Sequence, residues 1–180
     1  SWGATLAMLA AAREPERVAA LCLRAPFLAR REDIDAFFAG CPQSLAALHA
    51  DLHGGASHAA VQAALQWWRW ERQQAGMTAS AEADTAALVQ RYRVQSHYLV
   101  NDCFLTAPLL SHLAALRNTP ITIVHGDHDR VCPPAGTQAL QRIWPHAHVQ
   151  WVAGAGHDAA HLALVAAWMR ALDACWQSAA

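Results

Sequence analysis

The sequence predicts an α/β fold in which parallel strands are joined by crossover helices, and three observations point to this class. The segments 120–124 and 148–153 are short and rich in β-branched or apolar residues, as strands are. Each is followed by a longer segment with apolar residues at helical spacing, which is the alternation typical of parallel sheets. The chain is also apolar enough to bury a core, with 54% hydrophobic and 15% charged residues.

The first elements are a helix and a strand. Residues 2–13 have helical composition without an internal breaker, and Pro15 ends the predicted helix. The mostly apolar run at 17–27 fits a strand that is buried on both faces, as strands of parallel sheets usually are.

The middle of the chain predicts a helical block. Between Arg30 and Leu116, segments with helical periodicity such as AAVQAALQWWRWERQQ alternate with Gly, Pro and Ser breaks, and no convincing strand appears. We therefore expect three parts: core residues 1–29, a helical insertion at 30–116, and core residues 117–180.

The last part predicts a strand, a helix, another strand and a closing helix. The helix at 133–144 begins with proline, where a missing backbone N–H does no harm. The strand at 148–153 runs into a glycine-rich turn, and the final helix covers 161–176. Its apolar residues recur at the spacing of an amphipathic helix, whose apolar stripe normally faces the core: Leu162, Val165, Trp168, Met169 and Leu172.

Charge, apolar runs and cysteines limit the partners and the compartment. The formal net charge of −1 provides no basic field for nucleic acid or an anionic membrane surface. No apolar stretch is as long as a transmembrane helix needs. Five scattered cysteines without a C-x-x-C pair predict free thiols in a reducing, cytoplasmic environment. We expect neither nucleic acid nor a membrane as partner, and the oligomeric state stays open.

Polar residues follow both late strands, where parallel sheets place their functional groups. The first cluster is HGDHDRVCPP and the second is GAGHD. Together with Ser1 they provide a serine, an aspartate and a histidine in that chain order. A serine hydroxyl needs an imidazole to take its proton, and the imidazole needs a carboxylate to orient it. The sequence therefore predicts His157 as base and Asp129 or Asp127 as acid.

Several segments together resemble one family. SWG-TLA, PERV, WE, HYLVN, HGDHDRVCPP and GAGH are similar to the proline iminopeptidases, which are serine peptidases of the α/β-hydrolase superfamily. The resemblance implies the C-terminal part of an α/β-hydrolase fold, beginning at the nucleophile and carrying an inserted helical cap. It implies release of N-terminal proline from peptides, without a cofactor. One oxyanion donor of the family lies in an upstream loop, so we expect the chain alone to be inactive.

The resemblance also assigns catalytic roles. Ser1 corresponds to the family's nucleophile and His157 to its base, and the backbone N–H of Trp2 corresponds to one oxyanion donor. Asp129 aligns with the family's acid, whereas Asp127 falls where the family usually has arginine. Asp129 is therefore preferred, with Asp127 as the second choice.

The predicted cap supplies candidate substrate-binding residues. In the family, cap carboxylates hold the substrate's N-terminal amine and aromatic residues enclose the proline ring. Glu71 in WRWE matches one of those carboxylates, and Trp67 and Trp70 stand beside it. Gln95 in QSHYLVN stands where the family has its second glutamate. Because an amide carries no charge, we expect weaker selection for a free amine.

Other readings remain open. The tryptophans could simply pack the cap, as aromatic residues at helical spacing usually do. An esterase or amidase of the same fold, or a non-catalytic fragment that pairs with another chain, would also fit. An N-terminal-nucleophile hydrolase would use the terminal amine of Ser1 as base, but it leaves the aspartate and histidine loops unexplained. His157 and His161 imitate half of a zinc motif, but no third ligand is evident, so no metal is expected.

Overall fold

The computed structural model describes residues 1–77 and 83–179. Within them lies a parallel sheet of strand order β1-β2-β3, formed by β1 (Leu21–Arg24), β2 (Ile121–Gly126) and β3 (His148–Val152). Leu23 pairs with Ile123 in the first ladder, and Val124 pairs with Gln150 in the second. The α/β class with parallel strands is therefore confirmed, although β1 is shorter than the run at 17–27 that predicts it.

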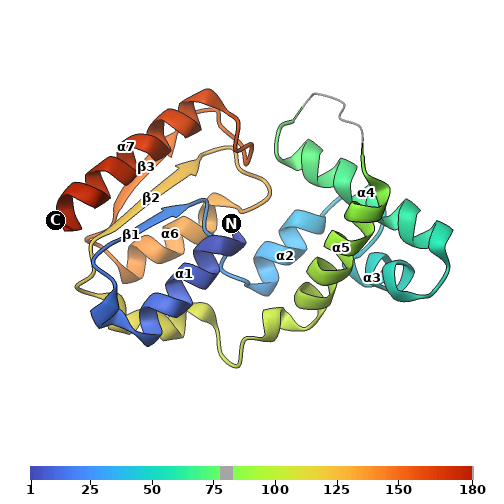
Figure 1. The fold of residues 1–180 in the computed structure, drawn as a ribbon, viewed down its shortest axis with the longest axis horizontal. Coiled ribbons are helices and arrows are strands. Elements are labelled where there is room, and N and C mark those ends of the chain that lie inside the picture. Colours follow the sequence, from blue (N-terminus) through green and yellow to red (C-terminus); the bar gives the residue numbers. More distant parts are fainter. Residues whose placement is uncertain (78–82, 180) are drawn as a thin grey trace.

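Helices cover both faces of the sheet (Figure 1). On one face, α1 (Trp2–Arg13), α6 (Pro134–Ile143) and the 3₁₀ segment η3 (Leu109–Leu116) share a core with the strands. On the other face lies α7 (Leu162–Ala179), which packs on Val124 and Val152. We call these helices and strands the body. The prediction places η3 in the 30–116 block, but its leucines pack in the body.

The cap is a helical unit with its own core beside the body (Figure 1). It consists of α2 (Arg31–Phe38), α3 (Leu45–His53), α4 (Ser57–Gln74) and α5 (Thr85–Val100). Ser44 and Asp84 cap α3 and α5 by accepting backbone N–H groups at 3.2 and 3.1 Å. The core of the cap is rich in aromatic and leucine side chains, with Trp67 and Tyr92 fully buried. Short 3₁₀ turns at η1 (Pro15–Arg17) and η2 (Asp102–Phe104) complete the described elements.

The closing helix faces the sheet with a different stripe from the one its sequence suggests. The sheet-facing residues of α7 are Leu164, Ala167 and Ala171. Of the stripe named above, Trp168 packs partly against this cluster, whereas Leu162, Val165, Met169 and Leu172 are exposed. The small side chains of Ala167 and Ala171 face the strands, and the bulky apolar side chains lie on the exposed face of α7. The expectation that the bulky stripe faces the core was wrong.

The described residues contain no single helix long and apolar enough to cross a bilayer. One sharply bent pair, Thr85–Val100 with Asp102–Leu116, meets the requirements of length and composition only when both parts are taken together.

Candidate active site

Ser1 lies at the carboxyl end of β1, at the start of α1. Its terminal nitrogen donates to the carbonyl oxygen of Arg24 at 2.8 Å. A serine at this position commonly caps the helix, yet the Ser1 side chain makes no capping hydrogen bond. The Ser1 Oγ instead lies 3.8 Å from the Sγ of Cys132. The hydroxyl is therefore not used to stabilise α1.

The acid loop after β2 holds Asp129 in a fixed position. Its Oδ1 accepts the backbone N–H groups of Val131 at 2.9 Å and Cys132 at 2.8 Å, and its Oδ2 lies 2.6 Å from the Nδ1 of His157. Asp129 is only 2% exposed. Asp127 is exposed and accepts the backbone N–H of Gly154 at 2.7 Å. The structure thus brings Asp129, the preferred candidate, to His157, and gives Asp127 a role in joining two loops.

The charge of Asp129 fixes the proton on His157. Burial alone would raise the pKa of Asp129. The pKa is nevertheless held well below its usual range, because the carboxylate accepts hydrogen bonds from His125, His157 and the Cys132 N–H and lies beside the charge of His157. An ionised carboxylate can only accept hydrogen bonds, so the Nδ1 of His157 carries the proton. The Nε2 then has a free lone pair, as a general base requires.

Two residues at the end of β2, His125 and Gly126, position the loops beside them. His125 is fully buried, and its ring nitrogens contact the Thr137 hydroxyl at 2.7 Å and the Cys132 carbonyl oxygen at 2.9 Å. A Cβ on Gly126 would lie 2.2 Å from the Ala155 carbonyl oxygen. Glycine at 126 therefore lets the loop that carries His157 come close to the end of β2.

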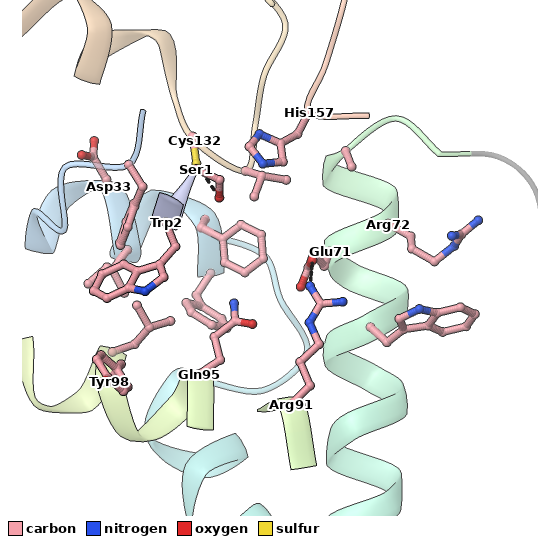
Figure 2. Close-up of a pocket in the computed structure, with 18 of the residues that line it drawn as sticks. Ser1, Trp2, Asp33, Glu71, Arg72, Arg91, Gln95, Tyr98, Cys132 and His157 are labelled. Atoms are coloured by element: carbon pink, nitrogen blue, oxygen red, sulfur yellow. Dashed lines mark hydrogen bonds and ion pairs between the residues drawn. The ribbon is translucent and has the colours of Figure 1, made fainter. Parts of the chain in front are cut away.

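A cavity of about 670 Å³ lies between the body and the cap. Ser1, Cys132 and His157 line it from the body, as Figure 2 shows. Aromatic side chains form much of the rest of its wall: Trp2, Phe27, Phe37, Phe38, Trp68 and Tyr98. Trp2 opens α1, so its backbone N–H belongs to the first helical turn, where N–H groups have no intrahelical partner.

Both candidate residues of the cap for amine binding line this cavity, but Glu71 already has partners. The Glu71 carboxylate forms an ion pair with Arg91 (Figure 2). It also accepts a hydrogen bond from the Tyr92 hydroxyl at 3.1 Å. Gln95 follows Arg91 by one helical turn on α5 and is half-buried in the cavity wall. The sequence did not single out Arg91, although its spacing from Gln95 places both side chains on one helix face.

The structure does not place Trp67 or Trp70, the candidate aromatic residues for substrate contact, in the wall of this cavity. Trp67 is fully buried in the cap and stacks on Tyr92 with ring centroids 4.9 Å apart. Trp70 donates its indole N–H to the Phe37 carbonyl oxygen at 2.7 Å and lies outside the cavity. Trp68 lines the cavity instead. Each residue along a helix turns the direction of the side chain by about 100°. Trp68 therefore points about 100° away from Trp67 and about 200° away from Trp70.

The described residues include no group of three or more His, Cys, Asp or Glu side chains arranged to hold a metal ion. All five cysteines are unpaired. Cys132 is buried, and burial raises the pKa of its thiol to about 12, so the thiol beside Ser1 stays protonated at neutral pH.

The fold is that of the α/β hydrolases. A solved membrane phospholipase A described as a bacterial virulence factor matches with a TM-score of 0.61 and 18% identity over 96% of this chain and 54% of that chain. An α/β hydrolase from a Medee basin deep-sea metagenome library matches with a TM-score of 0.59 and 15% identity, covering 96% of this chain and 62% of that one. At these identities the matches show the fold alone.

The sequence identifies the family. Residues 1–161 match the family described as "Serine aminopeptidase, S33", and the chain belongs to it. The proline iminopeptidase of Arabidopsis thaliana is 29% identical over 188 residues, covering 88% of this chain and 50% of that protein. That of Xylella fastidiosa is 30% identical over 191 residues, covering 88% of this chain and 60% of that protein. The chain thus spans between half and two thirds of the length of these relatives.

Proposed function

We propose that this chain carries the catalytic residues of a serine hydrolase that removes N-terminal proline from peptides. The observation that carries the proposal is the 2.6 Å contact between His157 Nδ1 and Asp129 Oδ2, made at the wall of the cavity that Ser1 also lines. The buried, ionised carboxylate leaves one ring nitrogen of His157 able to accept a proton. Ser1 lines the same cavity, and its hydroxyl accepts a weak hydrogen bond from the Cys132 thiol at 3.8 Å.

The first half of the reaction forms an acyl-enzyme. The Oγ of Ser1 attacks the carbonyl carbon of the substrate while its proton passes to Nε2 of His157. Negative charge develops on the carbonyl oxygen, which accepts a hydrogen bond from the backbone N–H of Trp2. The carbon–nitrogen bond then breaks, and His157 returns its proton to the departing amine.

The second half releases the acyl group. Water takes the place of the departed amine, gives a proton to His157 and attacks the ester carbon. Collapse of this intermediate breaks the bond to Ser1, whose oxygen regains the proton from His157. The products are a free acid and the original enzyme. Asp129 stays ionised throughout and orients the imidazole.

The proposed substrate class follows from the relatives and from the cavity. Two relatives are named proline iminopeptidases, and the aromatic wall described above is of the apolar kind that encloses a small ring. A second candidate, an esterase or amidase for uncharged acyl groups, is favoured by Gln95, which provides no charge at the position of the second glutamate.

Covalent labelling tests the proposal without assuming a substrate. The full-length gene product is treated with a fluorophosphonate, and the adduct is located by mass spectrometry. We expect a single adduct on Ser1, lost in Ser1→Ala and slowed by about 10³-fold or more in His157→Ala. Hydrolysis of proline β-naphthylamide by the same preparation tests the substrate. Absence of labelling, or labelling that does not need His157, would favour a non-catalytic fragment.

A further inference from the structure

The cavity differs from an amine-binding site in its charges. Two carboxylate residues, Asp33 and Glu71, line it, and each is paired with an arginine. Asp33 is 5% exposed and accepts the Arg30 guanidinium at 2.7 and 2.5 Å. Three arginines also line the cavity: Arg24, Arg72 and Arg91. The charge of each carboxylate is therefore already neutralised by an arginine, which weakens its attraction for a cationic ligand.

Arg91 neutralises the carboxylate that would attract an amine. It reaches the Glu71 carboxylate from the neighbouring helix α5, and its guanidinium lies 5.1 Å from the ring centroid of Tyr92. Tyr92 donates its hydroxyl to the other oxygen of the same carboxylate at 3.1 Å. The Glu71 side chain is 22% exposed, so its partners are only partly screened by water. A substrate amine would have to share this carboxylate with the charge of Arg91.

Gln95 does not restore the missing charge. It lies one turn along α5 from Arg91 on the same cavity wall, and its amide oxygen accepts hydrogen bonds without a net charge. Hydrogen bonds to charged groups are roughly twice as strong as neutral ones. The wall that would recognise a free N-terminus is thus neutral at Gln95 and already neutralised at Glu71.

We propose that Arg91 is a specificity-determining residue: by pairing with Glu71 it removes the preference for a charged amine, so that the cavity accepts uncharged acyl groups as well as an N-terminal proline. The inference rests on the proposed function in that it takes this cavity as the acyl-binding site. It concerns ligand selection and leaves the chemistry at Ser1 unchanged.

Binding of two small amides of equal ring size tests this proposal without requiring turnover. L-Prolinamide carries a cationic ring nitrogen at pH 6.5, whereas cyclopentanecarboxamide has carbon in its place. Calorimetry or ligand-observed NMR gives the ratio of their dissociation constants for the full-length gene product. We expect a ratio within about threefold of one for the unaltered protein. In Arg91→Gln we expect prolinamide to bind about tenfold tighter than its uncharged analogue, because Glu71 is released.

Three variants show whether the effect passes through Glu71. Arg91→Lys keeps a cation within reach of the carboxylate, so the ratio should stay near that of the unaltered protein. The double variant Arg91→Gln/Glu71→Gln should lose the gain, because no carboxylate remains to be released. Arg72→Gln is the matched control: it removes the same charge from the same cavity and leaves the pair of Glu71 with Arg91 in place. We expect it to change the ratio by less than about twofold.

Each result tests either the role of Arg91 or the proposed function. A preference of about tenfold or more for prolinamide in the unaltered protein overturns the role of Arg91. So does an unchanged ratio in Arg91→Gln when both amides bind. If neither amide binds to any folded variant, the cavity is not the acyl site, and both the inference and the proposed substrate class fail. Fluorophosphonate labelling of Ser1 then still tests the catalytic part of the proposed function separately.

Discussion

The body and the cap contribute to one cavity in different ways. In the body, Asp129 and His157 extend from loops that follow β2 and β3, and the hydrogen bonds of the Asp129 carboxylate are satisfied within those loops. In the cap, α4 and α5 line the cavity with one face and pack their core with another. Loops at strand ends fix a side chain by topology, whereas a helix divides neighbouring residues between function and packing. Substitutions in the body should therefore mainly lower the reaction rate, whereas substitutions in the cap should lower either stability or ligand binding.

The largest effect is expected at the acid of the body. Asp129→Asn should lower the rate of fluorophosphonate labelling of Ser1, or kcat/KM for a substrate, by about 10⁴-fold, because an amide favours the wrong tautomer of His157. Asp127→Asn is the matched control, since Asp127 bonds Gly154 and not the imidazole. It should change the rate by less than about threefold. Similar losses in both variants would place the acid elsewhere.

A second comparison separates packing from function within one helix. Trp67→Ala should destabilise the protein by about 3–5 kcal/mol, because it removes a fully buried ring stacked on Tyr92. Trp68→Ala should cost about 1 kcal/mol or less and should instead weaken binding of cyclopentanecarboxamide, since Trp68 lines the cavity. Denaturant unfolding and calorimetry measure the two quantities. Equal stability losses would mean that both rings pack the cap alike.

The proximity of Asp129 and His157 was predictable from the sequence, for a topological reason. Parallel strands end at one edge of the sheet, so polar clusters after 120–124 and 148–153 had to lie near each other. The choice between Asp129 and Asp127 depended on the family resemblance. In the structure it follows from the turn at Val131 and Cys132, whose N–H groups bind Asp129. Hydrophobic periodicity does not contain that turn geometry.

The cap and the closing helix were less predictable because a helical pattern does not say which neighbour each face meets. The WWRWE segment offered several aromatic residues, and only the fold of α4 against α2 and α5 shows that Trp68 faces the cavity. On α7 the large apolar residues dominated the pattern, yet Ala167 and Ala171 face the sheet. Arg91 was missed because its importance depends on Glu71, which lies on another helix.

A smaller change tests whether charge alone limits amine binding in the cap. Gln95→Glu adds a carboxylate to the cavity wall, so that two carboxylates, at positions 71 and 95, face the single guanidinium of Arg91. We expect prolinamide to gain about tenfold over cyclopentanecarboxamide, because the new carboxylate can accept a charge-assisted hydrogen bond. Gln73→Glu, on an exposed face of α4 outside the cavity, adds the same charge as a control. An unchanged ratio in Gln95→Glu would mean that the amine does not reach α5.

The smallest expected effect is on stability at low pH, where the body and the cap should also differ. Burial, followed by the positive charges of His53 and His97, lowers the pKa of His49 on α3 from 6.5, so the folded cap favours the neutral ring. Its contribution to stability is then fully present above pH 6.5 and is lost as the pH falls through the lower folded value. The depressed pKa of Asp129 means that the acid loop of the body keeps its contribution until the medium is much more acidic.

Hydrogen exchange between pH 7.5 and 5.5, corrected for intrinsic rates, can resolve this difference by region. Peptides from α3 should lose protection at the lower pH while peptides from β2 keep theirs, because His49 lies 3.0 Å from the Ser96 hydroxyl between α3 and α5 and protonation adds charge to that contact. His49→Gln retains a polar side chain that does not titrate, so it should reduce the pH dependence of α3, on which His53 remains. Equal protection of α3 at both pH values, or the same loss in His49→Gln, would show that the cap and the body respond to acid alike.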